Sequence, residues 1–381
     1  MNYDEIRQSG QRLLQESAEL SRQSADKQAA ASEVFAQLAG CTQAHVNPTK
    51  PPPIITEPNV TRIGSDREFR EALESEGERV VRVDNGLDIS VGSTIEVKHA
   101  GLTLLPSSFR LSAERDFDSQ MIQLRAPAVL QGIRQAHGQG THVDAGGDAC
   151  CGDLISLYPG AQGSVIRHCT LTEGVDETLD GWGDGIDDVT VEDSIIGFGI
   201  EPHSMGVLVG GGSNKSWIFR RNLMAYSNNR NPMLHVDKVH VYNNFIYRNK
   251  ARGIQAFGRY ERQEQSYYDN FVWHKDGVDG SWGSANAGEF DGGTLVLRAD
   301  GNMNNTTRKS INDDERLFWS ADAARNGKAL PYTGDIRPVE RMSDSVSADQ
   351  VWDLLREKVG APLRDDLIVN LIDEIDQQVA A

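Results

Sequence analysis

The amino-acid sequence predicts an all-β protein built as a parallel β-helix, in which short strands stack coil upon coil. From about Thr61 onward, short β-type apolar runs such as SVIRHCTL, DVTVEDSII and TLVLR are separated by Gly, Asn and Asp. Thirty-seven glycines in 381 residues, with 7% aromatic residues, suit many tight turns better than long helices. The apolar runs also recur at a nearly constant spacing.

The repeat consists of a small or amide residue placed directly before a short apolar run. Successive anchors are separated by about 25, 28, 22 and 26 residues, which suits a coil of two or three short strands. An inward-pointing Asn at a bend can hydrogen-bond the backbone of its turn and the Asn of the next coil. We therefore interpret the doublet Asn243-Asn244 as architectural. The anchors are Cys169, Ser194, Asn222, Asn244 and Asn270.

The chain before the repeats divides into two segments. Residues 1–42 predict a helix, in which Ile6, Leu13 and Leu20 share a seven-residue grid. This pattern fits either an amphipathic helix lying on the domain or a self-associating coiled coil, and the latter would allow a homotrimer. Residues 43–60 contain VNPTKPPPIITEP and predict a semi-rigid, extended linker.

The β-helix is expected over residues 61–318, followed by a C-terminal helical cap over residues 319–381. Within the cap, SADQVWDLLREKVG places Val351, Leu354 and Leu355 on one helical face, and DDLIVNLIDEIDQQV continues with a second amphipathic segment. We expect these helices to cover the last coil, because its sheet edge would otherwise be exposed.

Charge and composition exclude several classes of function. A formal net charge of −18 disfavours binding to nucleic acid or to an anionic membrane surface. No apolar run approaches the ~20 residues of a membrane span. The start, MNYDEIRQSGQRLLQ, lacks the apolar core of a secretory signal peptide. Four cysteines are too few for a disulfide scaffold.

The densest group of carboxylates lies in EGVDETLDGWGDGIDDVTVED, and Asp153 opens a strand one coil earlier. Residues one coil apart in a β-helix lie about 5 Å from each other, so Asp153, Asp176 and Asp180 could converge on one face. Three neighbouring carboxylates repel unless a hard cation joins them, and oxygen ligands favour Ca²⁺ over zinc. The other interpretation is a solvated acidic loop on an acidic protein.

Three further side chains are candidate sugar contacts. Trp182 lies in a glycine-flanked loop, where an exposed ring could stack on a sugar and a buried ring would serve only packing. His203 lies near the acidic coil, and His235 lies near Arg230. Each histidine could contact substrate or could be a hydrogen-bonded structural residue.

The order of motifs resembles the pectate lyase family of polysaccharide lyases. The motifs are GDLISL, VIRHCTL, VDETLD, DDVTVEDSII, MGVLVGG, FRRNLMAYSNNRNPML and VHVYNNF, with GAPLRDDLIVNLIDEI in the tail. The resemblance spans roughly Thr61–Asp376 and is strongest over Gly152–Asn249. It implies a right-handed parallel β-helix that cleaves uronic-acid polysaccharides by β-elimination, with Ca²⁺ as the cofactor.

The resemblance also assigns roles to residues. Asp153, Asp176 and Asp180 match the calcium ligands of the family, and Arg230 in NNRNP matches the arginine that takes the C5 proton of the sugar. A guanidine base is unusual, because Arg is protonated at ordinary pH. A site of low dielectric beside a cation would have to lower its pKa.

Two positions depart from the family pattern. His235 stands where a second, substrate-gripping arginine is common, and Met205 in HSMGVLVG stands where a lysine is usual. With that lysine absent, His203 is the candidate to assist the sugar carboxylate or the leaving oxygen. If the metal site is vestigial, Asp184 and Glu201 could instead act as the paired carboxylates of a glycoside hydrolase.

The overall organisation resembles a bacteriophage tailspike or tail-associated depolymerase. Such proteins are typically homotrimers that digest capsular or extracellular polysaccharide. The similarity consists of the N-terminal heptads, the proline-rich linker, the lack of a secretory signal and the solenoid body. The sequence thus predicts an extracellular or virion-associated depolymerase of an acidic polysaccharide, and a noncatalytic glycan-binding spike is a further alternative.

Overall fold

The computed structural model describes residues 60–380, except for 115–116, 118, 138–151, 202, 251, 260–261, 275–280, 286–292, 306–317, 322–329 and 332–333. The expected N-terminal helix over residues 1–42 and nearly all of the linker over 43–60 therefore lie outside the described residues. Those two expectations stay predictions. Within the described part of the chain, no helix is both long and apolar enough to cross a bilayer.

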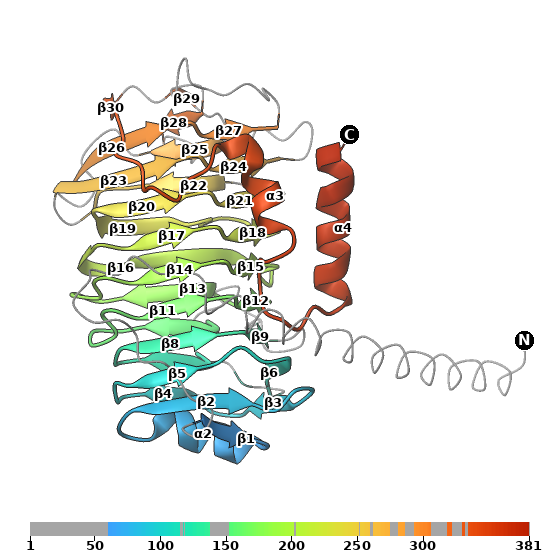
Figure 1. Ribbon diagram of the computed structural model, residues 1–381. Coiled ribbons are helices and arrows are strands. Elements are labelled where there is room, and N and C mark those ends of the chain that lie inside the picture. The colour runs from blue at the N-terminus through green and yellow to red at the C-terminus, as the bar shows by residue number, and fades with distance from the viewer. Residues whose placement is uncertain are drawn as a thin grey trace, which may run out of the picture.

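The described residues form a parallel β-helix, as predicted, with three sheets that run along its length (Figure 1). Every pairing in these sheets is parallel except that of β28 with β29. From β2 to β28 each coil contributes one strand to each sheet, so a strand pairs with its counterparts one coil before and one coil after.

Sheet A has eleven described strands. They are β1 (Val60–Ile63), β2 (Arg79–Val83), β5 (Leu102–Leu104), β8 (Ala128–Gln131), β11 (Val165–Arg167), β14 (Thr190–Glu192), β17 (Ile218–Arg220), β20 (Val239–Tyr242), β23 (Arg262–Tyr268), β26 (Thr294–Asp300) and β30 (Ile336–Arg337).

Sheet B has nine described strands. They are β3 (Asp88–Val91), β6 (Phe109–Ala113), β9 (Ile133–Ala136), β12 (Thr170–Thr172), β15 (Ile195–Gly197), β18 (Leu223–Ala225), β21 (Phe245–Tyr247), β24 (Phe271–Trp273) and β27 (Met303–Asn304).

Sheet C has ten described strands and carries the candidate site. They are β4 (Ile95–Val97), β7 (Ile122–Leu124), β10 (Ile155–Leu157), β13 (Glu177–Trp182), β16 (Met205–Lys215), β19 (Met233–Asp237), β22 (Arg252–Ala256), β25 (Ser281–Ala285), β28 (Trp319–Ala321) and β29 (Leu330–Pro331).

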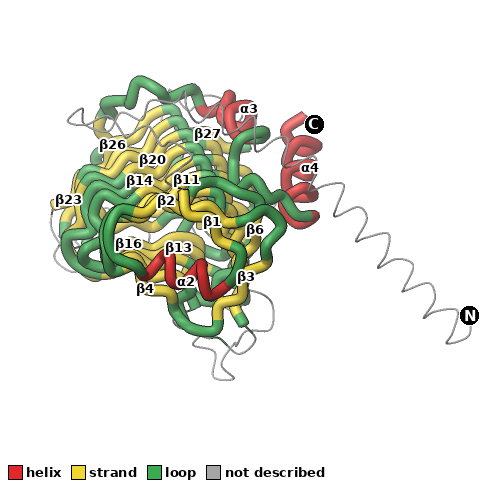
Figure 2. Tube along the Cα trace, turned by 60° about the horizontal axis from the view of Figure 1, so that its bottom comes forward, coloured by secondary structure: helices red, strands yellow, loops and turns green. Residues whose placement is uncertain are grey.

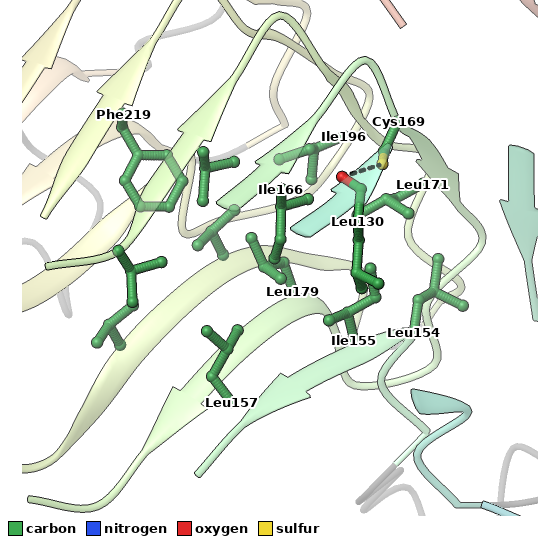
Figure 3. Close-up of a cluster of buried hydrophobic side chains, with 14 of the residues drawn as sticks. Leu130, Leu154, Ile155, Leu157, Ile166, Cys169, Leu171, Leu179, Ile196 and Phe219 are labelled. Carbon is green, nitrogen blue, oxygen red and sulfur yellow. Dashed lines mark hydrogen bonds between the residues drawn. The ribbon is translucent and has the colours of Figure 1, made fainter. Parts of the chain in front are cut away.

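The interior of the coils is a continuous apolar core. Side chains alternate across each strand, so one row points inward and stacks on the equivalent row of the next coil. Leu157, Leu179 and Ile166 are among the fully buried members of this core (Figure 3). Cys169 also lies in it, with its thiol directed at the Leu130 carbonyl oxygen at 3.7 Å.

The predicted asparagine ladder is present, and it extends to Asn302. The Asn244 backbone N–H donates to Asn270 Oδ1 at 3.1 Å, and the Asn222 N–H donates to Asn244 Oδ1 at 3.0 Å. The Asn270 N–H donates in turn to Asn302 Oδ1 at 3.2 Å. Ser194 joins the ladder below Asn222. The role that we expected for Asn244 is therefore confirmed.

The bend between sheets A and B has one recurring backbone conformation. The residue before each ladder position has a positive φ, which allows the chain to turn within two residues. Asn243 adopts φ 53°, and its side-chain amide donates to the carbonyl oxygens of Asp269 and Val346. The others are His168, Asp193, Arg221, Asp269 and Gly301.

The C-terminal helices are present, but the structure corrects their position. α3 (Val351–Leu355) and α4 (Asp366–Ala380) lie along the flank of the coil stack, over the outer face of sheet B (Figure 1). The helices lie there because the outer face of sheet B is apolar. Phe245 and Tyr247 are among the large side chains on that face, and they pack against Trp352 and its neighbours. A short 3-10 helix, η4 (Ala348–Gln350), leads into α3.

The first coil is covered by an N-terminal helix that the sequence analysis missed. α2 (Asp66–Glu74) lies at that end of the stack and contacts β2, β3 and β4 (Figure 2). Its Phe69 and Leu73 are fully buried and close the apolar core. Ser65 caps the helix by accepting a hydrogen bond from the Glu68 backbone N–H at 3.3 Å.

Replacing Asn244 tests the contribution of the ladder. In Asn244→Ala the buried N–H of Asn222 loses its acceptor, and the carbonyl oxygens of Phe219 and Tyr242 lose the hydrogen bonds that the Asn244 amide donates. We expect a loss of about 2–4 kcal/mol in the free energy of unfolding, measured by denaturant titration. Asn85→Ala is the control, since exposed Asn85 accepts one hydrogen bond from Ser108 and should cost about 1 kcal/mol or less. Equal losses in the two variants would contradict the interpretation.

Candidate functional site

The acidic residues gather on the outer face of sheet C, where β10 and β13 begin. Ser156 pairs with Asp180, and the Glu177 backbone N–H donates to Asp153 Oδ1 at 2.9 Å. Because Leu179 points into the core, Asp180 points to the outer face. The register thus places Asp153 beside Glu177, one coil away.

Three carboxylates approach closely enough to share one cation. One oxygen from each of Asp153, Asp176 and Glu177 lies within 4.8 Å of the others. Glu177 was absent from the predicted ligand set, and Asp180, which was in it, lies beside this trio. Asp180 is 7% exposed, and its Oδ1 has no hydrogen-bond partner among the described residues.

Burial and mutual repulsion change the protonation of this cluster. Burial, with the charge of Asp176, raises the pKa of Asp153 from 3.8 to about 7. Burial, with the charge of Asp153, raises the pKa of Asp180 well above its ordinary value. Two neighbouring carboxyl groups that resist ionisation, one with an unpartnered oxygen, are chemically suited to a divalent cation.

Arg230 lies against this cluster. Its guanidinium forms an ion pair with Glu177, and its side chain is 25% exposed. Its backbone has φ 61°, and its N–H donates to the side-chain oxygens of Asn229 and Gln255, both at 2.9 Å. Burial lowers the pKa of the Arg230 guanidinium, although the charges of Asp176 and Asp153 oppose that change.

His203 approaches the cluster from a neighbouring turn. Its Nδ1 lies 2.8 Å from Asp176 Oδ1, and both side chains are partly exposed. The turn is held by the Ile200 N–H, which donates to the Gly174 carbonyl oxygen at 2.8 Å. The structure therefore brings together three of the predicted residues that the sequence could only place on separate coils: Asp176, Arg230 and His203.

The structure corrects the expected role of His235. This side chain is 0% exposed, and its ring packs 6.2 Å from the ring of Phe257, so a sugar on the surface would not reach it. Met205, the other position that departs from the family pattern, is half-buried and pairs with Glu177 in the register of sheet C.

The remaining predicted contacts lie on the surface. Trp182 is 44% exposed at the end of β13. Asp184 is exposed and accepts a hydrogen bond from the Ser213 backbone N–H at 2.6 Å. Glu201 is exposed and forms an ion pair with Lys250.

Comparisons with known proteins agree with the fold. The chain is 27% identical over 260 residues to a probable pectate lyase C of Emericella nidulans, a match that covers 65% of this chain and 54% of that protein. The chain thus spans about half the length of this curated relative. The chain is a pectate-lyase-like parallel β-helix. No profile of a known protein family matches it.

Solved structures support the same fold. A pectate lyase from Bacillus sp. N165, solved with trigalacturonate, has a TM-score of 0.52 at 16% identity over 80% of this chain and 94% of that one. A pectate lyase from Paenibacillus sp. 0602 has a TM-score of 0.50 at 12% identity, over 84% and 95% of the two chains.

The raised pKa of Asp153 predicts a pH dependence of stability in the metal-free protein. A carboxyl group whose pKa is higher in the folded state stabilises the fold below its unfolded pKa, and this contribution is lost as pH rises. When the pH is raised from 3.8 to about 7 in the presence of a chelator, the melting temperature should fall less for Asp153→Asn than for the wild type. Parallel pH profiles of the two proteins would contradict this assignment.

Proposed function

We propose that the protein depolymerises an acidic, uronic-acid-type polysaccharide by β-elimination. In this reaction a base removes the C5 proton of the uronate, a C4–C5 double bond forms, and the C4–O bond breaks. The observation that carries the proposal is the position of Arg230, a partly exposed guanidinium against a cluster of buried carboxylates on one face of sheet C. The similarity to pectate lyases supports this class of reaction.

Arg230 is the proposed base. Its pKa is already lowered by burial, and the opposing influence comes from Asp176 and Asp153. Neutralising these two carboxylates would weaken the influence that keeps the guanidinium protonated, and the ion pair with Glu177 would have to open before Arg230 could act as a base. The hydrogen bonds to its backbone N–H fix the position of the residue on the chain, so the side chain is held close to the surface of sheet C.

Ca²⁺ is the proposed cofactor. Asp153, Asp176 and Asp180 would hold it, with Glu177 beside them, and the buried oxygen of Asp180 that lacks a partner fits this role. When bound, a calcium ion neutralises the sugar carboxylate and so acidifies the C5 proton.

His203 is the proposed assistant at the leaving oxygen or at the sugar carboxylate. Because Nδ1 faces Asp176, Nε2 lies on the opposite side of the ring, where it can face a bound sugar. An extracellular or virion-associated location, a capsular substrate and trimerisation through residues 1–42 remain predictions.

Arg230→Ala and Arg230→Lys test the proposed base. We expect the rate of formation of unsaturated uronate, followed by its ultraviolet absorbance on polygalacturonate, to fall by about 10²–10⁴ in both variants. Arg67→Ala is the control, because Arg67 lies on α2 with an 82% exposed side chain and should leave the rate unchanged. Full activity of the Arg230 variants would refute the assignment.

The mass of the products separates elimination from the alternatives. Elimination gives a product lighter than the hydrolysis product by one water. Falling viscosity with products of hydrolytic mass would favour a glycoside hydrolase using Asp184 and Glu201. Binding of polymer without any cleavage would favour a noncatalytic spike.

Removal of calcium tests the cofactor separately. We expect chelation to abolish elimination, and added Ca²⁺ to stabilise the protein by about 2.7 kcal/mol at a hundredfold excess over its dissociation constant. Asp180→Asn should lose most of this stabilisation, whereas Asp184→Asn, on an exposed turn, should keep it. Activity that survives the chelator would mean that the carboxylates do not serve a metal.

A further inference from the structure

The backbone of Arg230 departs from the repeat of the β-helix. Among the non-glycine residues that the structure describes, those with a positive φ recur from coil to coil at three bends, and only Ser204 and Arg230 lie outside these bends. The geometry of the solenoid therefore does not impose the conformation of Arg230. The bend residues are His168, Asp193, Arg221, Asn243 and Asp269 after sheet A, Glu173, Phe198, Tyr226 and Arg248 after sheet B, and Asp188, Ser216 and Lys238 after sheet C.

Both polar groups of the Arg230 backbone are bound by neighbouring coils. The N–H donates to Gln255 Oε1 at 2.9 Å, on β22 of the following coil, and it also reaches Asn229 Oδ1. The carbonyl oxygen accepts from the Val207 N–H at 2.6 Å, at the start of β16 in the preceding coil. A positive φ is unfavourable for a residue with a long side chain, and it persists where surrounding contacts fix it. Arg230 is thus held between two coils.

Gly206 allows the preceding coil to approach this closely. Its N–H donates to the Asn229 carbonyl oxygen at 3.0 Å. A Cβ atom on Gly206 would lie 2.5 Å from the Arg230 carbonyl oxygen and 2.6 Å from Asn231 Oδ1. Because the nearest of these atoms belongs to the backbone, any larger residue would push the Arg230 turn away from β16.

The following coil holds the turn from the other side. Gln255 is 1% exposed, so its side chain is fixed by packing as well as by its hydrogen bond. Asn231 is also buried, and its Nδ2 donates to the Arg252 carbonyl oxygen at 3.1 Å. The residues on both sides of Arg230 are therefore bound too, and the direction of its Cα–Cβ bond is set.

We propose that Gln255 and Gly206 are positioning residues, which set the direction of the Arg230 side chain on the face of sheet C. The inference rests on the proposed function, because Arg230 is the proposed base. It adds two buried residues that act through Arg230. A base must lie within hydrogen-bond reach of the proton that it removes, and a displacement of about 1 Å can cost about a hundredfold in rate. The loss falls on kcat, because binding of the polymer does not require this position.

Replacing Gln255 tests the acceptor. Gln255→Met keeps the length of the side chain and removes the oxygen, so we expect kcat on polygalacturonate to fall about 10-fold to 100-fold while KM changes by less than about twofold. Gln255→Glu, which keeps an acceptor oxygen, should recover most of the rate. Gln265→Met is the matched control and should lower the melting temperature at unchanged kcat. Gln265 is 0% exposed, and its amide donates to the carbonyl oxygens of Leu234, Val236 and Phe257.

Replacing Gly206 tests the same position from the other coil. Gly206→Ala should displace the Arg230 carbonyl oxygen, and we expect a loss of kcat similar to that of Gln255→Met, again with little change in KM. Gly64→Ala is the control, because a Cβ atom there would find its nearest neighbour, Asp84 Oδ2, at 3.6 Å. That variant should keep the kcat of the wild type.

Hydrogen exchange of the Arg230 amide gives a readout without substrate. Measured by nuclear magnetic resonance, exchange should be about tenfold faster in Gln255→Met than in the wild type and unchanged in Gln265→Met. An unchanged exchange rate in Gln255→Met, or equal losses of kcat in Gln255→Met and Gln265→Met, would overturn the positioning role and leave Arg230 as the proposed base. Wild-type kcat in Gly206→Ala would do the same for Gly206. A wild-type protein that forms no unsaturated uronate would refute the proposed function, and the positioning role with it.

Discussion

The structure depends on one constraint, which is that each coil must lie in exact register on the next. Backbone pairing alone would allow a strand to slip, and a slip of one residue would exchange the inner and outer faces. The buried asparagine ladder resists such a slip, because each amide oxygen accepts from the backbone N–H of its counterpart one coil away. The apolar core then fits only one alignment of the coils.

The same register builds the candidate site. Asp153, Glu177 and Arg230 come from different coils, and no local motif joins them. Stacking places them on one face of sheet C, where burial raises the pKa of Asp153 and lowers that of Arg230. Our proposal of function uses this arrangement, in which a cluster that resists ionisation lies next to a guanidinium that is less basic than usual. The fold supplies the energy that keeps these groups together.

Much of this could be predicted from the sequence, because spacing and residue type carry the information. The repeat length and the amides before each apolar run predicted the coils and the ladder, and the repeat also predicted that Asp153, Asp176 and Asp180 could converge on one face. Glu177 was missed because it follows Asp176 directly, and only the structure shows that both of these neighbouring carboxylates approach Asp153. The burial of His235 was missed for another reason, because its place in the strand puts it on the outer face and only packing against side chains such as Phe257 covers it.

The position of the C-terminal helices also could not be predicted from the sequence. Their amphipathic pattern showed that they cover an apolar surface, but not which one, and the outer face of sheet B was not recognised as apolar.

The most direct test of the account is a crystal structure of the protein grown with Ca²⁺. We predict an ion bound by Asp153 and its acidic neighbours at about 2.3–2.6 Å, with the Arg230 guanidinium on the same face of sheet C. An ion bound elsewhere, or an Arg230 side chain that points away from the acidic cluster, would contradict it.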